Sequence, residues 1–361
     1  MTDIEFLTLV QQQTDTKAVV VDEYYKSAFM DWAILDHNAP KHIISRKFDE
    51  LIDEFIRIEM PTPYESMVHY PFVKRLLDEL CFTCKEIGLF DDTFQKPLIG
   101  TANLTKINAY AKSDYNTIII DRNLMYFISN IARVVVGLIV TNEESDCYVK
   151  PSILTMDELK RRILADINIV RDFMEIMYSY IKYGTVFPYS QFHKLGNVDI
   201  GQYHQSMVYE ADRFIIAHEL MHLFYKHKQS NPAYENQADF MATQICGKSV
   251  EMRCPETQFY WVPVFVTATL DLLRKYGQSI GLDVSTHPDD RAGLAHYTIQ
   301  QMKAGGYALG MAEAIRGIMI MLWDITHKQV IELSKDPMIT DIDTLCRVVS
   351  LIDFKGNYNF Y

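Results

Sequence analysis

Two histidines and a glutamate interrupt an otherwise apolar run, FIIAHELMHLF, at residues 214–224. Titratable side chains are costly to bury in such surroundings unless they have partners. In an α-helix, His218 and His222 lie one turn apart on one face, with their Cβ atoms about 6 Å from each other, so both rings can reach one ion. Glu219 is displaced around the helix by one residue, which makes it a poor ligand but lets it reach a water molecule on that ion.

This H-E-x-x-H spacing is the arrangement of zinc peptidases. Zinc prefers imidazole and carboxylate ligands in tetrahedral geometry, and catalytic sites leave one position open for water. The ion lowers the pKa of that water to roughly 7, and Glu219 can then remove its proton as a general base. Because the motif also arises by chance, the interpretation depends on a third ligand.

Three downstream residues are relevant to that third ligand. His227 lies five residues past His222, on a different face, and is more simply a solvated residue at the helix end. Lys228 occupies the position where metzincins require a histidine, which excludes that class. Glu235 is the better candidate, since it begins the string ENQAD in a second predicted helix, with Asp239 one turn further on the same face. Acids that merely favour a helix start would account for Glu235 alone.

The combination of H-E-x-x-H with E-x-x-A-D resembles the gluzincin group of metallopeptidases. The resemblance implies a zinc ion bound by His218, His222 and Glu235. It also implies that Asp239 bonds to the free nitrogen of a ligand histidine and so fixes its tautomer. Soluble relatives with a similar core, the ImmA/IrrE-type and phage-exclusion (Lit-type) peptidases, act intracellularly on particular proteins.

A stretch at residues 107–111, INAYA, resembles the edge strand of the CAAX-prenyl-protease and heat-stress membrane-protease family. In those enzymes this strand borders the cleft, and its backbone can pair with an extended substrate. The resemblance therefore implies that Asn108, Ala109 and Tyr110 bind substrate. The simpler alternative is that Asn108 shapes a turn.

Residues 285–291, STHPDDR, resemble the S-x-H-P…R element of the same family. There the histidine or the arginine can help to stabilise the oxyanion of the tetrahedral intermediate. We assign His287 as catalytic and place Arg291 behind the ligands. Arg291 follows Pro288 more closely than in that family, and the transmembrane helices of those enzymes are missing. The simpler alternative is that Ser-Thr-His-Pro only starts a helix.

These residues need two neighbouring helices and a short sheet to position them. We expect the first helix to begin near residues 209–212, after a loop at 192–204. The second has Asn231 as its N-cap, Pro232 in its first turn and Gly247 just past its end. Two paired strands are expected at 106–111 and 116–121. Helical periodicity predicts further helices at 47–60, 70–88, 123–140, 156–184, 256–277, 288–303 and 306–333.

The expected fold class is therefore α+β and predominantly α-helical: a zincin-like metallopeptidase core with a small β-sheet and extra N- and C-terminal helices. We expect a helical N-terminal region at 1–95, the metallopeptidase domain at 96–300 and a C-terminal helical region at 301–361 packed on the core.

Composition excludes several partners. The net charge of −12 argues against a nucleic-acid-binding surface, which requires a basic face. Six cysteines are not a disulfide framework, and the lone C-x-x-C of Cys81 and Cys84 is more simply a pair of buried thiols. The apolar stretches 124–140 and 306–323 each contain an arginine, so we interpret them as buried or amphipathic helices and expect no membrane partner. The first 15 residues have no basic region and too short an apolar run, so we expect no secretory signal.

The leading hypothesis is a soluble, cytoplasmic zinc metalloendopeptidase that hydrolyses protein or peptide substrates; the sequence leaves its oligomeric state open. One alternative is a regulatory or interaction protein with a latent zincin domain, in which the helical residues 1–95 are the sensing part. The presence of Glu219 counts against it, because a degenerate site usually loses its base first. Another alternative is a toxin or phage-defence protease with one host-protein target.

Overall fold

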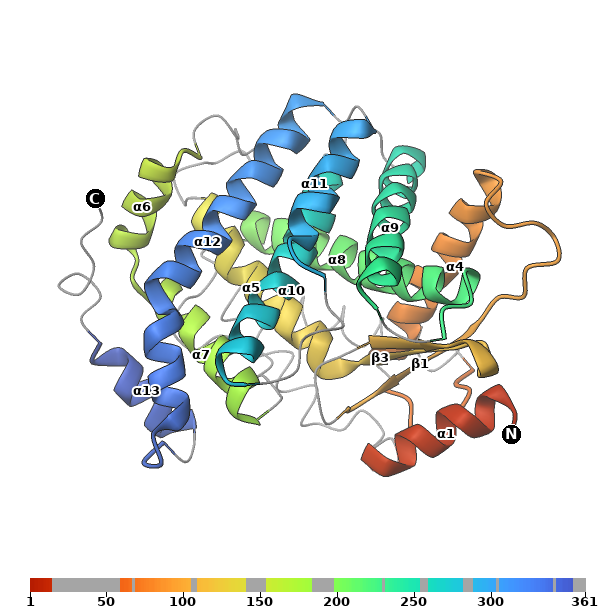
Figure 1. The fold of residues 1–361 in the computed structure, drawn as a ribbon, viewed down its shortest axis with the longest axis horizontal. Helices are drawn as coiled ribbons and strands as arrows, with labels where there is room; N and C mark the ends of the chain where they lie inside the picture. The colour runs from red at the N-terminus through yellow and green to blue at the C-terminus, as the bar shows by residue number, and fades with distance from the viewer. Residues whose placement is uncertain are drawn as a thin grey trace.

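Helices make up most of the protein, and a small sheet lies at one end of it (Figure 1). The structure is a computed structural model. It describes residues 1–14, 59–66, 69–104, 109–140, 154–183, 198–228, 231–253, 259–281, 288–302, 305–339 and 342–352.

The sheet has three strands in the order β1-β3-β2. Strand β3 (Thr117–Asp121) pairs antiparallel with β2 (Ala109–Lys112) and parallel with β1 (Leu98–Ala102). The predicted strand pair is thus confirmed over 109–121, whereas β1 was not predicted. The central strand reads TIIID and is buried along its whole length, as expected of a strand covered on both faces. In the described part of the chain, β2 pairs with β3 alone, so β2 is an edge strand.

Helix α1 (Asp3–Thr14) covers one face of the sheet, and α8 (Val198–Phe224) packs on the other (Figure 1). On the α1 side, Leu7 packs with Ala102 and Ile119 in a small cluster of its own. A buried carboxylate joins the helix to the sheet there, because Glu65 accepts hydrogen bonds from Gln11 and from Thr101. The first helix is therefore part of the support of the sheet.

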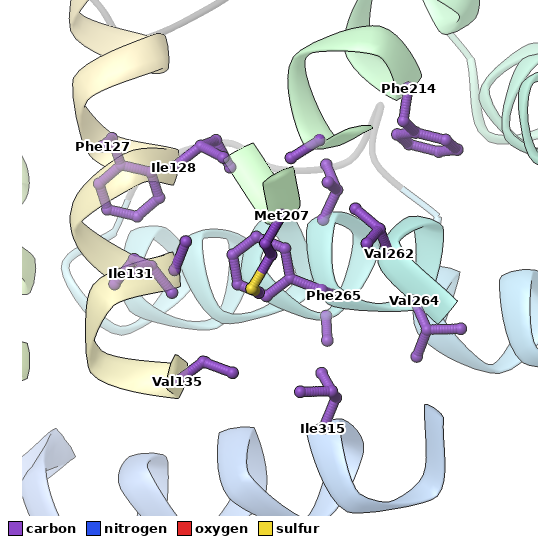
Figure 2. Packing of buried hydrophobic residues seen from close by; sticks show 14 of the residues in the cluster. Phe127, Ile128, Ile131, Val135, Met207, Phe214, Val262, Val264, Phe265 and Ile315 are labelled. Carbon is purple, nitrogen blue, oxygen red and sulfur yellow. The ribbon is translucent and has the colours of Figure 1, made fainter. Parts of the chain in front are cut away.

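The main core lies between α5 (Arg122–Ile139), α8, α10 (Val262–Ser279) and α12 (Gly306–Lys335). Figure 2 shows Phe265 and Met207 at its centre, surrounded by side chains from these four helices. The same cluster extends from Tyr70 to Val349, so it draws on all three predicted regions, whose boundaries stay a prediction. The other α-helices among the described residues are α4 (His69–Glu86), α6 (Met156–Ala165), α7 (Asn168–Tyr183), α9 (Pro232–Arg253), α11 (Arg291–Gln301) and α13 (Ile342–Ser350).

The single helix predicted over 156–184 is wrong. The structure divides it into α6 and α7, with a break at Asp166 and Ile167. The carboxylate of Asp166 accepts the backbone N–H of Asn168 at 3.1 Å. Aspartate competes with helical hydrogen bonds in this way, and here it starts a second helix.

Two predicted helix boundaries near the site are also wrong. Helix α8 begins at Val198 and not near 209–212, so residues 198–204 of the predicted loop are helical. Helix α9 continues past Gly247 to Arg253. A methyl group at Gly247 would collide with the end of the Met302 side chain, so this glycine allows close packing and does not end the helix. Residues 47–58 of the helix predicted at 47–60 lie outside the described residues, residues 59 and 60 are not helical, and α13 was not predicted.

Among the described helices, α5 alone is long and apolar enough to cross a membrane, and 72% of it is buried inside the protein. Such burial is typical of a core helix in a soluble protein, and it agrees with the interpretation of residues 124–140 as a buried helix. The cytoplasmic location stays a prediction. Cys81 and Cys84 lie on α4 as free thiols, and burial raises the pKa of Cys81 to about 11.

Candidate metal centre

Helices α8 and α9 pack against each other and bring the three predicted ligands together. The Nε2 atoms of His218 and His222 are 3.0 Å apart. One oxygen of Glu235 lies 3.3 Å from Nε2 of His218, and the other lies 3.6 Å from Nε2 of His222. All three side chains are largely buried, with exposed fractions of 9%, 12% and 11% for His218, His222 and Glu235.

The start of α9 places Glu235. The side chain of Asn231 accepts the backbone N–H groups of Ala233 and Tyr234, both at 3.0 Å, which confirms the predicted N-cap. Pro232 is the first helical residue, and Glu235 follows within the first turn, where a carboxylate is favoured by the helix dipole. The cap and the proline thus set the start of α9, and with it the position of Glu235 in the first turn.

A buried pair of opposite charges holds the first ligand histidine. Nδ1 of His218 donates to Oδ1 of Asp239 at 2.9 Å. Asp239 is fully buried and accepts two hydrogen bonds from Arg291, each 2.6 Å long. Burial would raise the pKa of Asp239, but Arg291 and His218 lower it below its usual value. Both residues therefore lie where the sequence analysis placed them, behind the ligands.

Arg291 is positioned in turn by α10. The carboxylate of Asp271 accepts the backbone N–H groups of Arg291 at 3.3 Å and of Ala292 at 3.1 Å. This contact fixes the first residue of α11 against α10. The chain of contacts from His218 on α8 through Asp239 on α9 and Arg291 on α11 thus ends on a fourth helix, α10, which keeps the ligand ring in one orientation.

The second ligand histidine has a different partner. Nδ1 of His222 lies 2.9 Å from Nδ1 of His227, and Nε2 of His227 lies 3.1 Å from the side-chain oxygen of Gln237. His227 also stacks on the ring of Tyr234, with the centroids 4.1 Å apart. His227 is half-buried and lies just past the helix end, as predicted, but the prediction that it faces away from His222 is wrong.

The end of α8 explains that error. The helix stops at Phe224, and Lys226 adopts a left-handed conformation with φ 54°. The N–H of His227 bonds to the carbonyl of His222, and that of Lys226 bonds to Leu223. This is a Schellman motif, which folds the chain back over the last turn. The prediction assumed that the helix continued to His227, which placed this residue on the wrong face. The chain reversal at Lys226 was not predicted, because the glycine that usually occupies this position is absent.

The hydrogen bonds assign tautomers to His222 and His227 when Oε1 of Gln237 is taken as the acceptor. A side-chain amide oxygen only accepts, so Nε2 of His227 donates to Gln237 and its Nδ1 accepts from Nδ1 of His222. His218 likewise uses its Nδ1 proton on Asp239. With their Nδ1 atoms engaged in this way, the two ligand histidines direct their Nε2 atoms toward each other and toward Glu235, where unprotonated rings can bind a cation. Three electron pairs facing one point repel unless a cation lies between them.

The spacing of these atoms fits such a cation. Ligands about 2.0–2.1 Å from a tetrahedral ion lie about 3.3 Å from one another, and the three observed separations of 3.0, 3.3 and 3.6 Å bracket that value. In the absence of a metal ion a proton can take its place: burial opposes it, but Asp239 and Glu235 raise the pKa of His218 to about 10. The donor set is therefore suited to a positive charge.

Glu219 lies next to His218 in the chain and is buried, with an exposed fraction of 7%. Burial raises the pKa of its carboxyl, and the nearby histidines only partly offset this effect. A raised pKa suits a group that must both take and return a proton near neutral pH.

The other predicted site residues divide into two groups. Ala109 and Tyr110 lie in β2, which contacts α8. Ala109 packs against the main core, whereas Tyr110 packs against the cluster under α1, as alternation along a strand requires. The side chain of Tyr110 thus points away from α8, and only its backbone can serve a strand on the edge. Asn108 and His287 lie outside the described residues.

Comparisons of the chain with models of known protein families, with curated proteins and with solved structures found no match.

Proposed function

We propose that this protein is a zinc metalloendopeptidase. The observation that carries the proposal is the convergence of the Nε2 atoms of two imidazoles and the Glu235 carboxylate on one point, next to the buried Glu219. Two imidazoles and one carboxylate leave the fourth position of a tetrahedral ion for water, which is the composition of catalytic zinc sites. The sequence resemblance to gluzincins supports the same assignment.

A zinc ion held by His218, His222 and Glu235 would supply a Lewis acid that polarises a carbonyl group and acidifies water. Glu219 takes the proton from the attacking water, and it returns a proton to the nitrogen of the cleaved peptide bond. Asp239, held in turn by Arg291, accepts the Nδ1 proton of His218 and so directs Nε2 of this ring at Glu235. These roles need no further titratable residue to balance the hydrolysis.

The edge strand supports an extended peptide as substrate. Strand β2 packs beside the ligand helix α8 and pairs on one side only among the described residues. A peptide that added to this edge would be held through its backbone, independent of most of its side chains. This arrangement favours an endopeptidase acting on unfolded or loop segments of proteins. The roles of Asn108 and His287 remain predictions from the resemblance.

The test compares the wild type with Glu219→Gln. We expect both proteins to hold one zinc ion by metal analysis, because Glu219 is not a ligand. We expect kcat/KM on a peptide library to fall about 10²- to 10⁴-fold in the variant, because the general base is removed.

Glu313→Gln is the matched control, since Glu313 is exposed on α12, and it should cleave as the wild type does. Wild-type protein that lacks stoichiometric metal, or equal cleavage by Glu219→Gln, contradicts the proposal.

A further inference from the structure

The two ligand histidines are both backed by a hydrogen-bond acceptor, but only one of these acceptors was expected from sequence. We propose that His227 is the positioning residue of His222, an inference that rests on the proposed metal site. Its Nδ1 accepts the Nδ1–H of His222 and thereby fixes the tautomer in which Nε2 of His222 is free to bind the ion.

Three contacts hold His227 itself. Gln237 accepts its Nε2–H at 3.1 Å, which keeps the proton off Nδ1. Tyr234 stacks on one face of the ring at an interplanar angle of 9°, and Tyr225 is nearly parallel to it at 17°. The ring is thus fixed in position and in tautomer, so it can orient another ring.

These contacts also join the two ligand helices. Tyr225 and His227 follow the end of α8, whereas Tyr234 and Gln237 lie in the first turns of α9, on either side of Glu235. The clamp formed by Tyr225, His227, Tyr234 and Gln237 therefore sets the separation of the helix ends that carry His222 and Glu235. On the sheet side, Ser113 donates to the backbone carbonyl of His227 at 3.3 Å, which ties the clamp to the turn after the edge strand.

Two substitutions test this inference by separating the role of His227 as a hydrogen-bond acceptor from the role of its ring in packing. His227→Asn places an amide oxygen close to the position of Nδ1 but removes the ring. His227→Phe keeps a ring that can stack on Tyr225 and Tyr234 but removes the acceptor. If His227 serves only to pack the clamp, Phe is the better replacement; if it positions His222, Asn is.

We expect His227→Phe to bind zinc about 10- to 100-fold more weakly than the wild type in competition with a chelator, as when other partners of metal ligands are lost. We expect His227→Asn to recover affinity to within a few-fold. The visible spectrum of bound Co²⁺ should change in the Phe variant and resemble the wild type in the Asn variant. Gln237→Leu should weaken zinc binding to an intermediate degree, because the tautomer of His227 is then less fixed.

These readouts use the metal alone and do not depend on proteolysis. Equal zinc affinity and equal Co²⁺ spectra in the wild type and His227→Phe would overturn this inference while leaving the metal site intact. So would a Phe variant that binds better than the Asn variant. If either fails to fold, an unchanged affinity in Gln237→Leu also counts against it. A wild type that binds no zinc overturns both this inference and the proposed function.

Discussion

His218 and His222 are adjacent on one helix face, yet their Nδ1 atoms form hydrogen bonds with partners of different charge. Asp239 is an anion, but the bidentate contact with Arg291 balances its charge inside the core. His227 is a neutral ring. Glu235 is therefore the ligand that brings a net negative charge to the ion, and the buried groups behind the histidines orient them without adding to it.

At this scale we expect Arg291→Met to lower the free energy of unfolding by about 3–5 kcal/mol, because it leaves Asp239 as a buried charge without its partner. Zinc affinity should fall as well, since His218 loses a fixed acceptor. Urea denaturation and chelator competition measure the two effects.

Arg316→Met provides the comparison. Arg316 pairs with Asp290 at 3.1 Å, but its side chain is 35% exposed, so the loss should stay below about 1 kcal/mol. Equal losses in the two variants would show that the buried pair has no special role.

At the scale of elements, the end of α8 determines where the second ligand finds its partner. The reversal runs through Lys226, a residue with a side chain in the left-handed region, where glycine is preferred. The contact of His227 with His222 depends on this backbone conformation at Lys226. It does not depend on the lysine side chain, which is exposed.

We therefore expect Lys226→Gly to raise the free energy of unfolding by about 0.5–1 kcal/mol, because glycine adopts this conformation without steric strain. Zinc affinity should stay unchanged. Lys228→Gly, two residues later and without a positive φ, should give no such gain. Thermal denaturation of the three metal-free proteins tests this expectation, and a loss of stability in Lys226→Gly would contradict it.

At the scale of the whole molecule, the N-terminal segments are built into the support of the site. Helix α4 contributes Val73, Leu76, Leu77 and Leu80 to the main core, and α1 packs on the sheet. Deleting residues 1–95 would expose both surfaces. A latent site is therefore better tested with the full chain than with a truncated one.

The buried Glu65 gives this support a pH dependence. Burial raises its pKa from 4.5 to about 7, although Thr101 and Gln11 donate hydrogen bonds to it. The folded state holds the proton more tightly than the unfolded state, so this contribution to stability is fully present below pH 4.5 and is lost as pH rises through about 7.

We expect Glu65→Gln to remove roughly 2–3 kcal/mol of the fall in unfolding free energy between about pH 5 and pH 8. Urea titrations at several pH values measure it. Glu5→Gln, an exposed glutamate on α1, should keep the wild-type pH dependence. The same dependence in all three proteins would rule out Glu65 as its source.

The sequence by itself determined the features that depend on a few consecutive residues. The spacing of His218 and His222 sets them on one helix face, and the Asn231 cap with Pro232 fixes the start of the helix that carries Glu235 and Asp239. The hairpin of β2 and β3 and most helices follow from local periodicity in the same way. Each of these is decided within one or two turns or strands, where propensity and capping act.

Tertiary structure decided what lies between those elements. The approach of α8 and α9 brings Glu235 to the two imidazoles, and Arg291 reaches Asp239 across 52 residues of sequence. The parallel pairing of β1, the close packing at Gly247 and the return of His227 to His222 likewise have no local signal. They depend on which apolar faces pack together. The hydrophobic free energy is proportional to the apolar area that distant segments bury against each other, and no single position in the sequence encodes that area.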